Sequence, residues 1–178
     1  MSRPLTIGDA GFSLIEILVT LLILMIGLLG LAGLQGRALT SQMESYQRSQ
    51  ALILIKDMEG RINANWANTS NYVTDPAAPL GVGHAACTGS TTTSIDLCEW
   101  DSALKGSAEG ATLGAMIGAR GCIYELSNTP PKQYIIAIAW QGLTRTATPG
   151  VGCGQGSYGS NDALRRVISI PITIAKLS

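Results

Sequence analysis

The first long segment of the chain is almost uniformly apolar. Residues 12–34 read FSLIEILVTLLILMIGLLGLAGL, and their polar side chains are those of Ser13, Glu16 and Thr20. A run of this length and apolarity can cross a bilayer as an α-helix. A secretory signal peptide is the alternative, but it begins with a basic region and has a shorter apolar stretch. We therefore expect a membrane-spanning helix.

After Gly36 the hydrophobic pattern changes from continuous to periodic. Charged residues now separate apolar residues that recur at helical spacing, namely Ala51, Ile55, Met58, Ile62 and Trp66. The helix is therefore expected to continue to about Asn65. Its length from Phe12 would be roughly 80 Å at 1.5 Å per residue.

The C-terminal half alternates between loops and β-rich runs. A short helix is predicted over 96–104, with Ser94 as its N-cap and Gly106 after its end. Strands are predicted over 121–126, 133–140 and 165–174, with a turn at Pro130 and Pro131 between the first two. Pro171 has no amide donor, so the last strand should lie at a sheet edge.

The balance of charges argues against a nucleic-acid partner. Twelve basic residues match twelve acidic ones, so the composition lacks the basic surface of a dedicated nucleic-acid binder. For Arg165 and Arg166 we expect ion pairing at the surface. The three tryptophans lie on apolar patterns and are expected in the core; they are Trp66, Trp100 and Trp140.

Residue types that carry catalysis are sparse. His84 is the single histidine, which leaves no imidazole cluster for a metal and no basis for a Ser-His-Asp set. The GxGxxG match at 154–159 lacks the following helix and acidic residue of a nucleotide site. We expect no enzymatic activity, no metal and no cofactor.

Four cysteines follow the apolar segment, and none forms a CxxC pair. They predict disulfides, and hence a fold formed outside the reducing cytosol. Pairing Cys87 with Cys98 and Cys122 with Cys153 closes the nearest loops and is favoured. The two crossed pairings remain open: Cys87–Cys122 with Cys98–Cys153, and Cys87–Cys153 with Cys98–Cys122.

Glu16 requires an explanation, because an ionised carboxylate inside hydrocarbon costs about 2.5–3.5 kcal/mol even on insertion scales. One explanation is local. Ser13 and Glu16 fit the S/T-x-x-E capping box, in which the two residues satisfy each other's backbone amides at a helix start. The capping box does not account for the glycine directly before Phe12 or for the apolar run that follows.

The hexapeptide GFSLIE at 11–16 resembles the processing site of type IV prepilins and type II secretion pseudopilins. The resemblance implies cleavage between Gly11 and Phe12 by a prepilin peptidase, with N-methylation of Phe12. It also implies that Glu16 pairs with the N-terminal amine of a neighbouring subunit. In a dry filament core such pairing would reward the correct axial register.

Four later segments are similar to V-type minor pilins (PilV-like): DLCEWDSAL at 96–104, RGCIYEL at 120–126, YIIAIAWQG at 134–142 and RRVISI at 165–170. The resemblance implies an α+β pilin fold, with a long N-terminal helix packed on a C-terminal antiparallel β-sheet. The implied layout is a leader at 1–11, a transmembrane and assembly half-helix at 12–36, and a globular domain at 37–178.

The function implied is a minor pilin that primes or joins type IV pilus assembly and supports twitching motility and adhesion. Expected partners are prepilin peptidase, other minor and major pilins, the inner-membrane assembly platform and membrane lipid. The subunit would cross the inner membrane once, with its N-terminus cytoplasmic and its bulk periplasmic, and then enter the surface filament. The alternatives are a type II secretion pseudopilin, and a filament-displayed receptor for DNA or another ligand.

Overall fold

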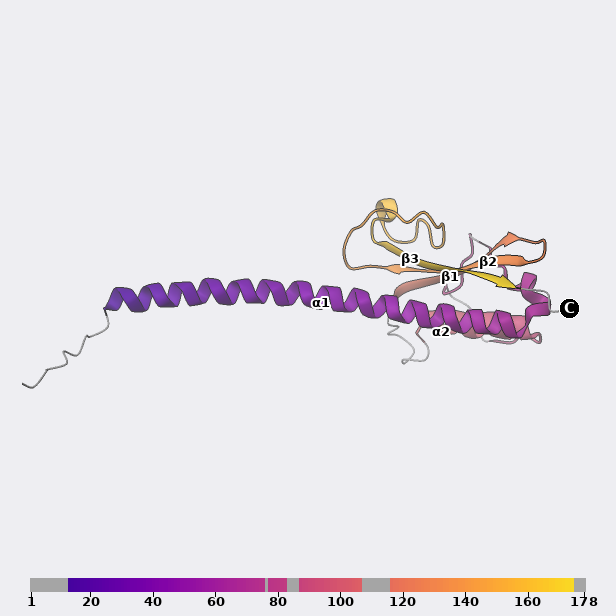
Figure 1. The fold of residues 1–178 in the computed structure, drawn as a ribbon, viewed down its shortest axis with the longest axis horizontal. Helices are drawn as coiled ribbons and strands as arrows, with labels where there is room; N and C mark the ends of the chain where they lie inside the picture. Colours follow the sequence, from indigo (N-terminus) through magenta and orange to yellow (C-terminus); the bar gives the residue numbers. More distant parts are fainter. Residues whose placement is uncertain (1–12, 76, 83–86, 107–115, 175–178) are drawn as a thin grey trace, which may run out of the picture. The chain divides into compact units, whose positions relative to one another are not determined.

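A computed structural model of the chain describes residues 13–75, 77–82, 87–106 and 116–174. A long helix α1 is followed by short helices and by a three-stranded antiparallel sheet (Figure 1). The chain divides into two compact units, Met1–Gln42 and Met43–Ser178, and the division falls within α1. The expected α+β fold with a long N-terminal helix is confirmed.

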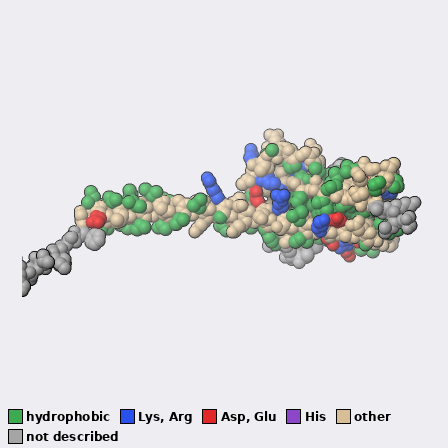
Figure 2. All heavy atoms as spheres, in the orientation of Figure 1, with side chains coloured by type: hydrophobic (Ala, Val, Ile, Leu, Met, Phe, Trp, Pro, Cys, Tyr) green, Lys and Arg blue, Asp and Glu red, His purple; other side chains and the backbone are tan. Residues whose placement is uncertain are grey.

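Helix α1 (Leu14–Ala64, 51 residues) is continuous, as the sequence pattern predicts. In the first unit its large apolar side chains are all exposed, from 47% at Leu21 to 76% at Leu14. Figure 2 shows hydrophobic side chains over this stretch. Within the described ranges, α1 is the one helix that is long and apolar enough to cross a membrane, by length and composition.

In the second unit α1 buries one face. The buried positions recur every three or four residues, as an amphipathic helix requires, and are Gln47, Ala51, Ile55, Met58 and Ile62. The apolar stripe predicted from the sequence is therefore confirmed as far as Ile62.

The prediction that Trp66 belongs to the core is wrong, because its side chain is 46% exposed. Helix α1 ends at Ala64, and Asn65 leaves the helical region with φ −112° and ψ 42°. A 3₁₀ helix η1 (Trp66–Tyr72) begins there. The 3.6-residue periodicity therefore stops before Trp66, and the next buried side chains are those of Thr69 and Tyr72.

The sheet contains β1 (Ile117–Ser127), β2 (Lys132–Gln141) and β3 (Arg165–Ile174) in the order β1-β2-β3. Both neighbouring pairs are antiparallel, and β2 pairs with β3 without a register shift, from Lys132 opposite Ile174 to Gln141 opposite Arg165. The three predicted strands are confirmed, and β1 is longer than expected. Pro171 lies on an edge strand, as its missing amide donor requires.

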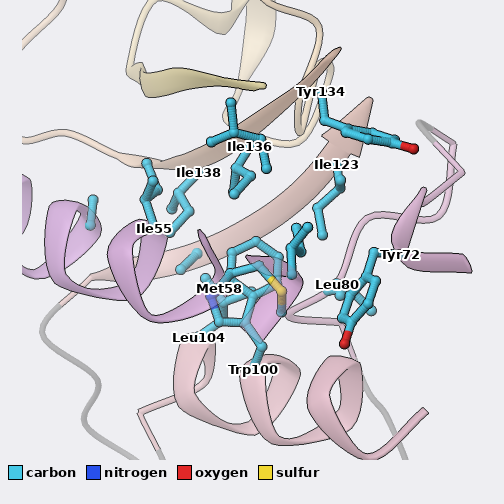
Figure 3. Packing of buried hydrophobic residues seen from close by; sticks show 14 of the residues in the cluster. Ile55, Met58, Tyr72, Leu80, Trp100, Leu104, Ile123, Tyr134, Ile136 and Ile138 are labelled. Carbon is cyan, nitrogen blue, oxygen red and sulfur yellow. The ribbon is translucent and has the colours of Figure 1, made fainter. Parts of the chain in front are cut away.

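Each face of the sheet buries its own set of side chains. On one face, isoleucines of the strands pack with residues of α1 and of the second helix α2 (Thr92–Leu104), as Figure 3 shows for Ile123, Ile136, Ile138, Ile55, Met58, Trp100 and Leu104. On the other face the connection between β2 and β3 covers part of the sheet through Cys153 and Tyr158. Trp100 and Trp140 are buried, as predicted.

Helix α2 starts earlier than the sequence pattern suggests. Its N-cap is Thr91 rather than Ser94, and Ser94 occupies the third helical position. The amide of Ser94 donates to Thr91 Oγ1 at 3.2 Å, while the amide of Thr91 donates to Ser94 Oγ at 3.1 Å. This reciprocal capping box satisfies two amides that the helix leaves unpaired, and therefore extends the helix toward its N-terminus.

Arg165 is not a surface residue, contrary to expectation, because only 1% of it is exposed. Its guanidinium donates to the carbonyl oxygens of Pro149, Val151 and Cys153, and its Nε lies 3.2 Å from Asp162 Oδ2. The neighbouring Arg166 pairs with Glu44 near the surface. The buried cation thus braces the loop between β2 and β3. Asp162 compensates its charge and its two terminal nitrogens donate to loop carbonyls, whereas its Nε makes no hydrogen bond to a described residue.

Candidate functional site

Glu16 lies in the first turn of α1, two residues after the helix begins at Leu14. Its backbone amide donates to the carbonyl oxygen of Ser13 at 2.9 Å, and the amide of Ile17 donates to the same oxygen at 3.4 Å. Among the described residues, no hydrogen bond joins the Glu16 amide to the Ser13 hydroxyl. The half of a capping box that the Ser13 hydroxyl would supply, and that Thr91 supplies in α2, is therefore missing at the start of α1.

The Glu16 side chain is exposed and has no ion-pair partner among the residues that the structure describes. Its neighbours on the helix are apolar and also exposed, with Leu14 at 76% and Ile15 at 68%. A continuous apolar surface of this kind is unusual on a soluble monomer and marks contact with a membrane or another protein. The site can offer a partner one negative charge within an apolar contact surface.

The two residues of the expected cleavage junction, Gly11 and Phe12, lie outside the described residues, as does His84. Cleavage and N-methylation there stay predictions. Glu16 lies one helical turn beyond Phe12 in the sequence.

The structure joins Cys87 to Cys98 and Cys122 to Cys153, the pairs that close the nearest loops, with Cα–Cα distances of 5.6 and 5.8 Å. The second disulfide is fully buried and ties the β2–β3 connection to the outer face of the sheet. Cys87 is exposed, in the segment before α2. Non-reduced peptide mapping tests this pairing.

Sequence reasoning missed a polar cluster around Glu44, on the first turn of α1 in the second unit. Glu44 Oε1 accepts hydrogen bonds from the Thr144 hydroxyl at 2.8 Å and from Arg166 Nη2 at 3.1 Å. Partial burial opposes ionisation, yet these two donors hold the pKa of Glu44 below its ordinary value. The three-residue spacing from Glu44 to the buried Gln47 was the available signal.

A second cluster fastens the C-terminal end of α1 to α2. Arg61 Nη1 lies 3.0 Å from Asp96 Oδ1 and 2.6 Å from Glu99 Oε2. Although desolvation opposes it, the carboxylates of Glu99 and Asp57 raise the pKa of Arg61. In the described ranges, no group of three or more His, Cys, Asp or Glu side chains is arranged to hold a metal ion. Both clusters form contacts that position α1 within the second unit.

Two family models match the chain. Residues 8–32 match the prokaryotic N-terminal methylation motif, and residues 33–103 match the Tt1218-like model, described as type IV pilin Tt1218. No curated protein and no solved structure matches the chain. The first match covers the Gly11–Phe12 junction, Glu16 and most of the apolar run. The second begins in α1 and ends in α2.

Proposed function

We propose that this chain, which carries a type IV pilin domain preceded by the N-terminal methylation motif, is a minor pilin of the V type that takes part in assembling type IV pili. The observation that carries the proposal is the first unit of α1. It presents an exposed apolar surface with the Glu16 carboxylate at its start, and most of this surface lies within the match to the N-terminal methylation motif.

In this proposal the precursor is held in the inner membrane by α1, with its N-terminus cytoplasmic and the second unit periplasmic. Prepilin peptidase cleaves after Gly11, and the new amine of Phe12 is methylated. The oxidised cysteines fit a periplasmic second unit. After transfer through the assembly platform, the apolar helix packs among the helices of other minor and major pilins.

Glu16 acts as a register device in this assembly. Inside a bundle of apolar helices its charge is costly unless a positive group contacts it. The N-terminal amine of the neighbouring subunit is such a group, because methylation leaves a terminal amine able to carry its charge. Axial positions that leave the two charges apart are then penalised.

A pseudopilin of a type II secretion system is the second candidate, because the processing site at 11–16 resembles both classes. The two candidates differ in the phenotype of a deletion strain. A minor pilin requires that surface pili and twitching decline while secretion continues. Loss of secretion with normal pili would favour the pseudopilin.

Variants of Glu16 test the proposal at the level of the side chain. Glu16→Ala and Glu16→Gln are both expected to be cleaved and held in the membrane, and both should fall at least about tenfold in sheared filaments, because an amine without its carboxylate remains in the core. Glu59→Gln is the matched control, since Glu59 lies on the same helix and, among the described residues, forms its ion pair with the exposed Lys56. It should assemble normally.

The Glu16→Gln variant separates the two explanations of Glu16. Glutamine also fits a capping box, so a purely local role predicts near-normal incorporation of this variant. Normal incorporation of Glu16→Ala would refute the assembly role assigned to Glu16. The measurement is the ratio of cleaved subunit in filaments to cleaved subunit in membranes, quantified for each strain.

A further inference from the structure

The two charges in the described part of the first unit are spaced like the two surfaces of a bilayer. Glu16 and Arg37 are the charged side chains between residues 13 and 42, and 21 positions separate them. In a continuous α-helix this spacing corresponds to about 31 Å. The hydrocarbon core of a typical bilayer is about 30 Å thick. Both side chains are exposed, and neither forms an ion pair with another described residue.

The helix between these charges has no polar group that needs water. Over Ile17–Leu34 the single polar side chain is that of Thr20, whose hydroxyl donates to the carbonyl oxygen of Ile17 at 2.9 Å. The backbone amides and carbonyls are paired within α1. Every polar group in this span is therefore satisfied inside the helix, which is the condition for lying in hydrocarbon.

Polar side chains resume on both sides of the span. Ser13 and Glu16 precede it, while Gln35, Arg37 and then Thr40 follow it. Shifting the helix by one turn in either direction would draw Glu16 or Arg37 into hydrocarbon and expose apolar side chains to water at the other end. The charges thus define one favoured depth, and they do so for either orientation of the helix.

We propose that the subunit stored in the membrane places Ile17–Leu34 in the hydrocarbon of a phospholipid bilayer, with Glu16 in one headgroup layer and Arg37 in the other. Arg37 contacts lipid phosphate, for which its planar guanidinium offers paired donors. This inference deepens the proposed function and rests on its claim that α1 anchors the precursor. Its consequence is that Glu16 stays hydrated during storage and loses water only on entering the filament.

Depth measurements test this register directly. The full-length chain, reconstituted in vesicles of phosphatidylcholine and phosphatidylglycerol, is labelled with a nitroxide on a single introduced cysteine. Labels are placed in turn along 14–42, while the four native cysteines are held as disulfides. Collision with oxygen and with a water-soluble nickel reagent reports depth. The deepest label is expected at about Ile26, midway between the two charges.

Two substitutions should move the profile of label depth along the helix in opposite directions. Glu16→Leu should shift the deepest position by about three residues toward the N-terminus, and Arg37→Leu should shift it by about two residues toward the C-terminus. Arg48→Leu is the matched control, because Arg48 lies on the same helix beyond the span, and it should leave the profile unchanged. Arg37→Lys should also retain it.

Three results would overturn the proposal. They are a deepest label near Ile23 in the wild-type chain, a profile that neither Glu16→Leu nor Arg37→Leu moves, and labels that vary with helical periodicity but show no depth gradient. If the Arg37→Leu chain cannot be reconstituted in vesicles, the depth profile of Arg37→Gln is compared with that of Arg37→Lys instead. A correct depth profile combined with absence of the wild-type chain from sheared filaments would refute the proposed function and leave this register intact.

Discussion

Helix α1 has two lengths, Leu14–Gln42 and Met43–Ala64, which differ in whether their side chains are buried. The stretch from Leu14 to Gln42 is the more apolar, yet none of its residues is buried. The stretch from Met43 to Ala64 carries most of the charges of the helix, yet it buries five side chains, four of which belong to the core formed with the sheet and α2. Apolarity alone therefore does not decide which part joins the core. The first length needs a nonaqueous partner outside the described fold, whereas the second has that partner within its own unit.

The largest effect is expected where α2 covers the second length. Trp100 is fully buried, and its indole nitrogen donates to the Leu54 carbonyl oxygen at 2.9 Å. Trp100→Ala should lower the free energy of unfolding by about 3–5 kcal/mol. Trp66→Ala is the control and should cost less, about 1–2 kcal/mol, because nearly half of the Trp66 side chain is already exposed. Urea unfolding in non-ionic detergent, followed by circular dichroism, measures both.

Two isoleucines on the second length give a comparison within a single turn. Ile55 is fully buried and Ile53 is 59% exposed. Ile55→Ala should cost about 2–5 kcal/mol of unfolding free energy, through lost burial and the cavity that remains. Ile53→Ala should cost less than about 0.5 kcal/mol. Equal losses at the two positions would mean that α1 does not dock on the sheet by the face assigned to it.

A smaller effect is expected at Glu44, where the second length begins. Because the pKa of Glu44 is lowered in the folded state, its stabilisation is complete above the unfolded pKa of about 4.3 and is lost as pH falls through the folded pKa. Glu44→Gln should therefore lower the unfolding free energy at pH 7, by less than about 1 kcal/mol because the side chain is 30% exposed.

The difference between wild type and Glu44→Gln should vanish in acid, and unfolding curves measured from pH 7 down to pH 2.5 follow it. Thr144→Val removes one donor and leaves Arg166 in place, so it should produce part of the same pH dependence. A difference that persists unchanged at low pH would show that the Glu44 carboxylate is not the stabilising group.

The periodic elements of the fold were predictable from local pattern. The α1 stripe up to Ile62 and the alternation of exposed and buried residues from Pro171 to Ile174 in β3 follow the period of each element directly. The prediction that Trp66 is buried was wrong because no glycine or proline marks the end of α1 in the sequence. The predicted N-cap of α2 was wrong because four consecutive residues are all suitable caps, and only the geometry selects among them. They are Thr91, Thr92, Thr93 and Ser94.

Contacts between distant segments were not predictable in the same way. Arg165 is buried because three loop carbonyls and Asp162 surround it, and no spacing in the sequence announces partners of that kind. The disulfide pairs were favoured from loop length alone, which left the crossed pairings open. For Glu16, position and neighbours followed from the sequence, while its expected partner belongs to another subunit and so cannot appear in one chain.

The central claim is that the first length of α1 is a processed assembly surface. Mass spectrometry of the N-terminal peptide from sheared surface filaments tests it most directly. We predict that the chain is present in the filaments and begins at Phe12 with an N-methyl group. An intact leader, cleavage near Ala38 as in a secreted protein, or complete absence of the mature chain from the filaments would contradict the claim.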